Sequence, residues 1–296
     1  MNYIVQQIVN GLSVGSIYAL TAIGYTMVYG ILRLINFAHG DVLMVGAYAG
    51  LVLGLNFFLP TWVALLITII VACIFGYLIE RLAYRPLRGA SQDATLLSSL
   101  AISLLLEHLA MMIFTPQPKA FHLPASLASP IIVKGIIVSN LFYLTVISTI
   151  VLAIVVFTFI KYSKAGIAMR ACSENIIAAN LMGISVNKIV SLTFIIGAGL
   201  AGFGGFMLAG QYARIAPLMG FIIGVKAFIA CVIGGIGNIY GAVLGGFILG
   251  LSEMLIVGLL PAQFSGYRDV FVFSMLIIIL LIMPNGIFGS IGERRS

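Results

Sequence analysis

The sequence predicts an all-α membrane protein, a polytopic bundle of about eight or nine transmembrane or re-entrant helices. Hydrophobic residues make up 62% of the 296-residue chain, and charged residues only 8%. A soluble domain carries about 25% charged residues, which it needs to cover its surface. This chain would aggregate in water, whereas in a bilayer the same surface faces lipid. The apolar segments leave no stretch that could fold as a separate soluble domain, so residues 1–296 are predicted to form one membrane domain.

Apolar segments of membrane-spanning length recur along the whole chain. A spanning helix needs about 20 apolar residues, because about 1.5 Å per residue must cover a hydrocarbon core of about 30 Å. The predicted segments are 8–32, 36–56, 61–80, 94–114, 136–160, 187–209, 221–236, 240–260 and 269–288. The segment 221–236 is short and interrupted by glycine, so it is predicted to be a half-helix or a re-entrant segment.

Basic residues in short loops predict the topology, since cytoplasmic loops carry an excess of Lys and Arg. The net charge of +7 therefore indicates orientation in a membrane rather than binding to nucleic acid. The cytoplasmic clusters are Arg81, Arg85 and Arg88, then Lys161, Lys164 and Arg170, and finally Arg294 and Arg295. The Pro-rich loop 115–135 holds only Lys119 and Lys134 and is predicted to lie outside. Nine full spans would place the N-terminus outside, and one end changes sides if 221–236 does not cross.

The basic, polar segment 161–188 is predicted to form two short helices in the cytoplasm. Ser173 is the predicted N-cap of the second helix, and Glu174 in its first turn complements the helix dipole. Gly183 suits the left-handed position that follows the end of a helix. A helix of about nine residues is too short to be stable alone, so we expect it to dock into a groove on a partner.

Small residues and polar breaks suggest how the helices are arranged. Spacings of four recur at Gly197, Ala201, Gly205 and Ala209, at Gly241 and Gly245, and at Gly246 and Gly250. Such spacing favours close packing of helices in lipid. Alternatively, the breaks 36–41 and 234–238 mark discontinuous helices around a central pathway. Because Arg214 and Gly220 precede an apolar run as Arg33 and Gly40 do, an inverted repeat is possible.

Charged residues inside apolar segments are the candidates for chemistry. A central Lys or Asp costs about 2.5–3.5 kcal/mol in a membrane, so such groups usually have partners inside the bundle. Lys226 and Glu253 are predicted to form a structural ion pair, with a proton relay as the alternative. At the break that contains Asn36, His39 and Asp41 are expected to hydrogen-bond an exposed helix end rather than to shuttle protons.

The sequence contains none of the common catalytic motifs and no Gly-x-x-x-x-Gly-Lys-Ser/Thr phosphate loop. The spacing of Cys73, Cys172 and Cys231 suits neither a metal site nor a disulfide framework. We therefore expect a transporter subunit rather than an enzyme, with no cofactor of its own. If ATP drives transport, another subunit must bind and hydrolyse it.

Several motifs, in order along nearly the whole chain, resemble those of the LivH-type permeases, the membrane subunits of branched-chain amino acid ABC importers. They are 24–30 (GYTMVYG), 35–41 (INFAHGD), 80–86 (ERLAYRP), 170–183 (RACSENIIAANLMG), 226–228 (KAF), 234–237 (GGIG) and 283–287 (MPNGI). The resemblance implies a multi-pass protein of the bacterial inner membrane. It also implies a second permease of LivM type, two cytoplasmic ATPases that bind ATP and Mg, and a periplasmic substrate-binding protein.

The resemblance identifies 161–188 as the cytoplasmic coupling segment that sits in a groove on an ATPase. The ABC permease pattern is Glu-Ala-Ala, three residues, then Gly. Ala178, Ala179 and Gly183 match it, whereas Ile177 replaces the glutamate and Glu174 lies three residues earlier. The residues that the resemblance assigns to ATPase coupling are Arg170, Glu174, Ala178, Ala179 and Gly183.

Two classes of function remain open from the sequence. The first is an ABC importer subunit for leucine, isoleucine and valine, with urea, short amides or other amino acids as alternative substrates. The second is a secondary transporter or channel that works without ATP. The coupling segment favours the first class, because an ion-coupled carrier has no need of a docking helix.

Overall fold

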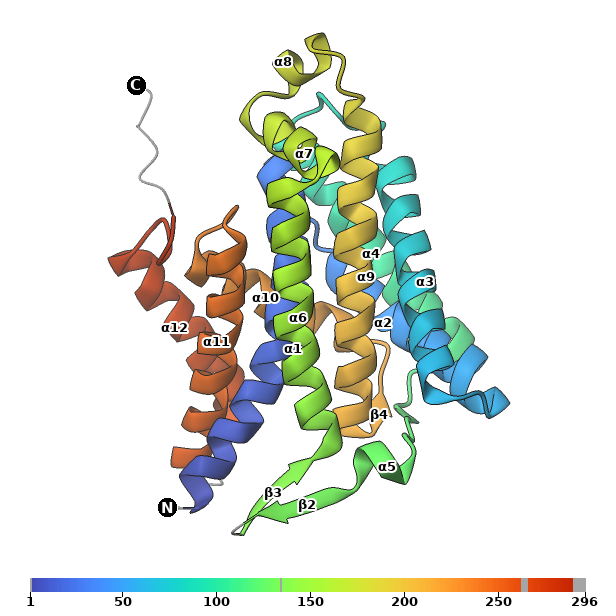
Figure 1. Ribbon diagram of the computed structural model, residues 1–296, viewed down its shortest axis with the longest axis vertical. Helices are drawn as coiled ribbons and strands as arrows, with labels where there is room; N and C mark the ends of the chain where they lie inside the picture. Colours follow the sequence, from blue (N-terminus) through green and yellow to red (C-terminus); the bar gives the residue numbers. More distant parts are fainter. Residues whose placement is uncertain (1, 134, 262–265, 290–296) are drawn as a thin grey trace.

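The computed structural model describes residues 2–133, 135–261 and 266–289 and shows an elongated bundle of helices (Figure 1). Within these residues, seven helices are long and apolar enough to cross a membrane, which confirms the predicted class. They are α1 (Asn2–Leu32), α2 (His39–Ala49, continued to Phe57 by η1, Gly50–Gly54, and η2, Leu55–Phe57), α3 (Thr61–Ile79, continued by η3, Glu80–Tyr84), α4 (Gln92–Phe114), α6 (Asn140–Tyr162), α9 (Val186–Tyr212) and α11 (Ile239–Leu259). Two shorter helices, α10 (Met219–Gly234) and α12 (Arg268–Ile282), complete the bundle.

Short elements close the two ends of the bundle. At one end lie the N-terminus, α5 (Ala125–Ala128) and two antiparallel pairs of strands, β1 (Lys119–Ala120) with β4 (Arg214–Ile215) and β2 (Pro130–Val133) with β3 (Ile136–Ser139) (Figure 1). The helices α7 (Lys164–Glu174) and α8 (Ile176–Leu181) lie at the opposite end. The charge pattern predicts this separation, and we call the two ends outer and cytoplasmic. Lys134, Arg294 and Arg295 lie outside the described residues.

The main contacts that the helices of the series α1–α4 make with those of the series α9–α12, or within their own series, have counterparts in which the two series exchange roles. The packing of α1 on α11 is matched by that of α9 on α3, and the packing of α1 on α10 by that of α9 on α2. The contacts between α2 and α4 are matched by those between α10 and α12. Since α1 and α9 run in opposite directions (Figure 1), the series α1–α4 and α9–α12 form an inverted repeat.

Glycines allow the tightest of these contacts, as the spacing of small residues predicts. A Cβ atom on Gly246 of α11 would lie 2.5 Å from the Cα of Ala19 in α1. One on Gly11 of α1 would lie 2.8 Å from the Cα of Leu251 in α11. Real Cβ atoms do not approach backbone this closely, so larger residues would separate the two helices.

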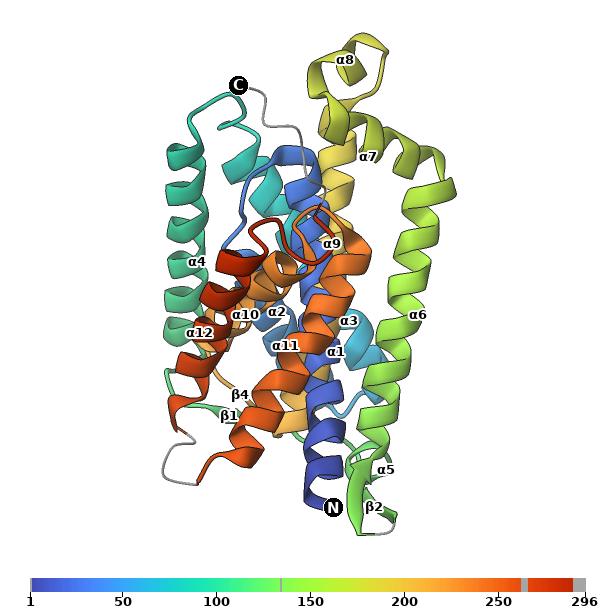
Figure 2. The ribbon, with the colours of Figure 1, turned by 90° about the vertical axis from the view of Figure 1, so that its left-hand side faces the viewer.

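The helices α2 and α10 begin inside the bundle rather than at its ends (Figures 1 and 2). This confirms that the segment 221–236 is a short helix. The proposed pairing of breaks was wrong, however, because 234–238 is only the turn between α10 and α11, where Asn238 caps α11. The counterpart of 36–41 is the stretch 214–220, which leads into α10, so the sequence parallel between Arg33 with Gly40 and Arg214 with Gly220 is confirmed. A helix that starts inside the bundle needs a break in the chain just before it. Of the two breaks, 214–220 leads into α10, which starts inside the bundle, whereas 234–238 follows α10.

Candidate functional site

The first residues of α2 and α10 touch deep inside the protein. A Cβ atom on Gly40 would overlap the carbonyl oxygen of Gly220 and lie 2.6 Å from the Cα of Gly224. A Cβ on Gly220 would lie 2.6 Å from Asp41 Oδ1. The N-termini of two helices thus converge, and each brings the positive end of its dipole to the junction.

Asp41 supplies a carboxyl group at this junction. It lies in the first turn of α2, is fully buried, and its Oδ2 accepts a hydrogen bond from the Ser103 hydroxyl of α4. The position of its Oδ1 near Gly220 places one carboxylate beside the starts of both helices. The Asp41 carboxyl therefore lies at the positive ends of two helix dipoles, inside the protein.

The expectation that His39 and Asp41 satisfy an exposed helix end was wrong. Ala38 is the N-cap of α2 and provides no side-chain cap. Among the described residues, His39 Nε2 and Asp41 Oδ1 have no hydrogen-bond partner. Instead the His39 ring packs edge-on against Tyr25, at 4.7 Å between ring centroids, and next to Gly24 of α1. Alanine has no polar side-chain atom with which to cap the helix.

Asn36 fixes the chain that leads into α2. Its Oδ1 accepts a hydrogen bond of 3.1 Å from the Tyr84 hydroxyl, which also lies 3.2 Å from the Ile35 carbonyl oxygen. Asn36 and Tyr84 are both buried. The role that the structure gives Asn36 is therefore to hold the break in place.

The predicted ion pair is present and belongs to a larger network. Lys226 Nζ of α10 lies 2.7 Å from Glu253 Oε1 of α11 and 2.8 Å from Asp269 Oδ1 of α12. Glu253 Oε1 also accepts from Arg268 Nε at 2.9 Å, and its Oε2 accepts from the Tyr18 hydroxyl at 2.8 Å. This network joins α1, α10, α11 and α12 in the outer half of the bundle.

Sequence reasoning missed Tyr18, Arg268 and Asp269 as members of this network. Arg268 and Asp269 lie at the start of an apolar segment. Charged residues are common at the ends of membrane spans, so these two do not indicate a buried network. Only the packing of α12 against α10 brings them to Lys226. Tyr18 carries no signal of its own in an apolar helix.

Another buried carboxylate, that of Glu80, lies at the cytoplasmic end of α3. It accepts hydrogen bonds from Arg88, from Arg85 at 2.9 Å and from the Ser191 hydroxyl of α9 at 2.7 Å. The hydrogen bond to Glu80 raises the pKa of the Arg85 guanidinium, whereas burial lowers that of Arg88. The network ties the loop after α3 to α9, and the sequence identified its basic residues only as a topology signal.

The coupling segment differs in detail from its prediction. The helix expected from Glu174 to Gly183 is α8, which spans only Ile176–Leu181. Ser173 is not its N-cap, because it lies inside α7 and its hydroxyl donates to the Arg170 carbonyl oxygen at 2.7 Å. Asn175 is the cap, with an extended backbone and a side chain that accepts from the Ala178 amide. Glu174 thus closes α7 and is exposed.

Gly183 ends α8 as predicted. Its φ is +83°, its amide donates to the Asn180 carbonyl, and the Ile184 amide donates to that of Ala179. These two bonds form a Schellman motif, in which Ile184 packs against the buried core. Ala179 is buried as well, whereas Ala178 is exposed.

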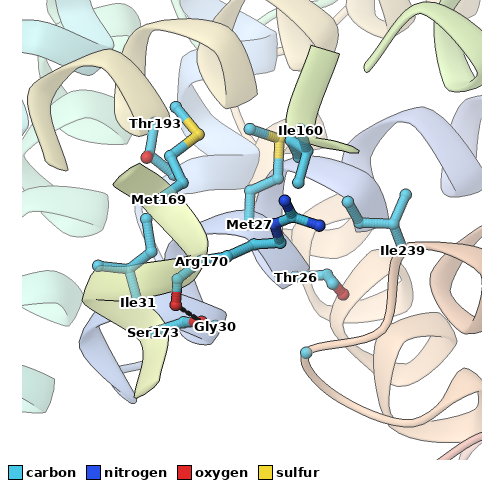
Figure 3. A pocket seen from close by; sticks show the side chains of 11 residues that line it. Thr26, Met27, Gly30, Ile31, Ile160, Met169, Arg170, Ser173, Thr193 and Ile239 are labelled. Atoms are coloured by element: carbon cyan, nitrogen blue, oxygen red, sulfur yellow. Dashed lines mark hydrogen bonds between the residues drawn. The ribbon is translucent and has the colours of Figure 1, made fainter. Parts of the chain in front are cut away.

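Arg170 connects α7 with the bundle. It is one of the residues lining a small cavity of about 90 Å³ at the cytoplasmic end, between α1, α6, α7, α9 and the turn before α11. Figure 3 shows its side chain reaching across the cavity toward Met27 and Ile239. Its Nη2 donates to the Lys161 carbonyl at 3.2 Å. Movement of α7 would therefore displace the Arg170 side chain relative to the end of α1 and the start of α11.

The exposed surface of α8 and of Met182, which follows it, is apolar, although α8 projects beyond the cytoplasmic end of the bundle. Ile177, Leu181 and Met182 are 74%, 82% and 83% exposed. Large apolar side chains grouped on a projecting turn are typical of an interaction site. Within the described residues, the five predicted coupling positions lie together on α7, α8 and the turn that follows.

Comparison with known proteins agrees with these features. A family model described as "Branched-chain amino acid transport system / permease component" matches residues 7–280. The chain is 43% identical to the high-affinity branched-chain amino acid transport system permease protein BraD of Pseudomonas aeruginosa, over 96% of this chain and 95% of the relative. It is 39% identical to the corresponding LivH protein of Escherichia coli K12, over 97% and 96%. A probable LivH of Methanocaldococcus jannaschii is 34% identical over 93% and 89%.

Proposed function

The chain belongs to the family of branched-chain amino acid transport system permease components, and we propose that it imports leucine, isoleucine and valine delivered by a periplasmic binding protein. It is a multi-pass membrane subunit of an ABC importer rather than an enzyme. The observation that carries the proposal is a family match over residues 7–280, in a chain whose α7–α8 segment projects an apolar surface from the cytoplasmic end. Asn36, His39, Asp41, Lys226 and Glu253 are its polar framework.

The proposed importer requires ATPase subunits and a second permease beside this chain. Its sequence has no phosphate-binding loop, so two ABC ATPases would bind ATP and Mg and supply the hydrolysis. A second permease of LivM type would complete the membrane domain, with residues 1–296 forming one half. The segment 161–188 would dock on an ATPase through α8, because a short apolar helix fits the groove-binding mode of recognition.

Copurification in mild detergent from the native host tests the assembly. We expect two ATPases and a second permease in the purified material, and leucine, isoleucine and valine as ligands of the accompanying binding protein. A binding protein that takes only urea or short amides would reassign the substrate. Recovery of this chain alone, with transport in vesicles that contain no ATP, would contradict the proposal.

Leu181→Asp is expected to weaken ATPase binding without harming the bundle. Leu181 is 82% exposed and contributes nothing to the core, so its loss leaves packing intact. A charge placed in an apolar groove on the partner should lower the recovery of ATPase at least about tenfold, which corresponds to about 1.4 kcal/mol. The matched control is Phe58→Asp, which changes a 95% exposed apolar residue at the outer end. Equal recovery of ATPase with both variants would refute docking through α8.

Gly183→Val is expected to uncouple ATP hydrolysis from substrate. A β-branched residue at φ +83° costs about 1–2 kcal/mol or more, and a Cβ at this position meets no atom within 4 Å. The effect is therefore on the backbone at the end of α8 alone. Substrate-stimulated ATPase activity in proteoliposomes should be lost, while Gly183→Asn, which tolerates this conformation, should retain it. Normal stimulation in the valine variant would rule out the role of this turn.

A further inference from the structure

A cavity of about 380 Å³ lies in the outer half of the bundle. Its walls come from the end of α9, the chain through β4 into α10, and the start of α12, together with Tyr18 of α1 and Pro118 before β1. It reaches from Arg214 in β4 at the outer end to Met219, the first residue of α10. The cavity therefore leads from the outer end toward the junction of α2 and α10.

The charges on the lining of this cavity have one sign. Arg214, Lys226 and Arg268 line it, and no carboxylate does. Two carboxylates behind or beside the wall pair with Lys226 and Arg268: Glu253, which is 1% exposed, and Asp269, which is 51% exposed and lies 2.8 Å from Lys226 Nζ. Arg214 is exposed and makes no ion pair within the described part of the chain. Among the described residues, Arg214 is therefore the cation on this lining that no carboxylate offsets, and arginine suits the geometry of a bound carboxylate.

The rest of the lining is mostly apolar, with the rings of Tyr18 and Tyr212 beside aliphatic side chains. Leu208 of α9, Leu218 before α10, and Met219, Ile222 and Ile223 of α10 contribute side chains to it. Cavities of about 300–1,000 Å³ with mostly apolar walls and a few placed polar groups are typical of small-molecule sites. A ligand with a carboxylate and a branched aliphatic side chain matches both parts of this wall.

We propose that this cavity is an outer subsite that holds the α-carboxylate of the substrate amino acid at Arg214 and Arg268 and its aliphatic side chain against α10. This inference rests on the proposed function and specifies where the substrate is held. Arg214 is free to take the carboxylate, whereas Arg268 is already positioned by its Nε bond to Glu253. The ion network around Glu253 thus joins the helices and also holds the Arg268 side chain in position for the substrate.

Direct binding without the binding protein tests the subsite, since a change at the outer end could also disturb docking of that protein. The sample is the purified complex of permeases and ATPases, and the probes are millimolar leucine and leucinamide, which lacks the carboxylate charge. We expect saturation-transfer NMR to show leucine bound about tenfold more tightly than leucinamide, the effect of a charge-assisted hydrogen bond at a partly exposed site. Arg214→Gln should remove this preference.

Lys119→Gln is the matched control, because Lys119 lies on β1, paired with β4, but does not line the cavity. It should keep the preference for leucine. The subsite is refuted if Arg214→Gln also keeps the preference, or if the unaltered complex binds no leucine. Uptake by the complete importer separates this outcome from failure of the proposed function: leucine uptake with no effect of Arg214→Gln refutes the subsite alone, whereas absence of leucine uptake refutes the function.

Discussion

Gly40→Ala is expected to prevent the junction of α2 and α10 from closing and to abolish transport. The new Cβ would overlap the Gly220 carbonyl oxygen and lie 2.6 Å from the Cα of Gly224. These are backbone atoms of a helix, which cannot turn aside as a side chain can. Overpacking usually costs about 1–3 kcal/mol, and a backbone collision belongs at the upper end of that range. Thermal unfolding in detergent should shift to lower temperature, and uptake in proteoliposomes should be lost.

Gly30→Ala provides the control for this prediction. Gly30 lies in the last turn of α1, and a Cβ there meets nothing within 4 Å. Alanine favours a helix over glycine by about 1 kcal/mol, so this variant should be as stable as the original protein or more so. If both variants unfold and transport alike, the close approach of the two helices does not matter for function.

The sequence predicted the bundle well because the bilayer imposes simple rules. Length and hydropathy locate every long helix, since each backbone polar group in lipid must be satisfied within its own helix. The spacing of small residues on α9 and α11 likewise predicted close packing, as at Gly246 against Ala19. These features depend on local composition, which a single sequence records directly.

The sequence alone does not predict the junction of α2 and α10. Both 214–220, which holds Arg214, Pro217 and Gly220, and 234–238 interrupt the apolar runs, and a sequence does not tell which of them precedes a helix that starts inside the bundle. The reciprocal contacts of α2 and α10 decide between them. Depth in the membrane is a property of the assembled helices, so it follows from tertiary packing rather than from the break itself.

The end of α7 shows a similar limit. Ser173 and Asn175 are equally good N-cap residues by type, so propensity alone does not choose between them. The choice depends on how far α7 continues along the bundle, where Met169 and Cys172 are buried. Burial of these side chains extends α7 to Glu174 and leaves Asn175 to begin α8.

Glu253→Leu is expected to destabilise the outer half of the bundle by about 3–5 kcal/mol, because it removes the buried counter-charge of Lys226 and leaves only the half-exposed Asp269. Lys226 is 2% exposed and would keep only Asp269, while Arg268 and the Tyr18 hydroxyl would lose their acceptor. Thermal unfolding in detergent should measure the loss. Asp269→Asn should have a smaller effect, since that side chain is 51% exposed and water can replace its contacts.

The double variant Lys226→Met with Glu253→Leu separates a structural ion pair from a proton relay. Removing both charges avoids an unpaired buried group, so part of the lost stability should return. Glu253→Gln completes the set, because it keeps the shape of the side chain and removes its ability to carry a proton. A structural pair requires that this variant still transport substrate, at a stability between those of the original protein and Glu253→Leu. A relay requires that transport stop even where the protein remains folded, and the Lys226–Glu253 pair would then belong to the translocation mechanism.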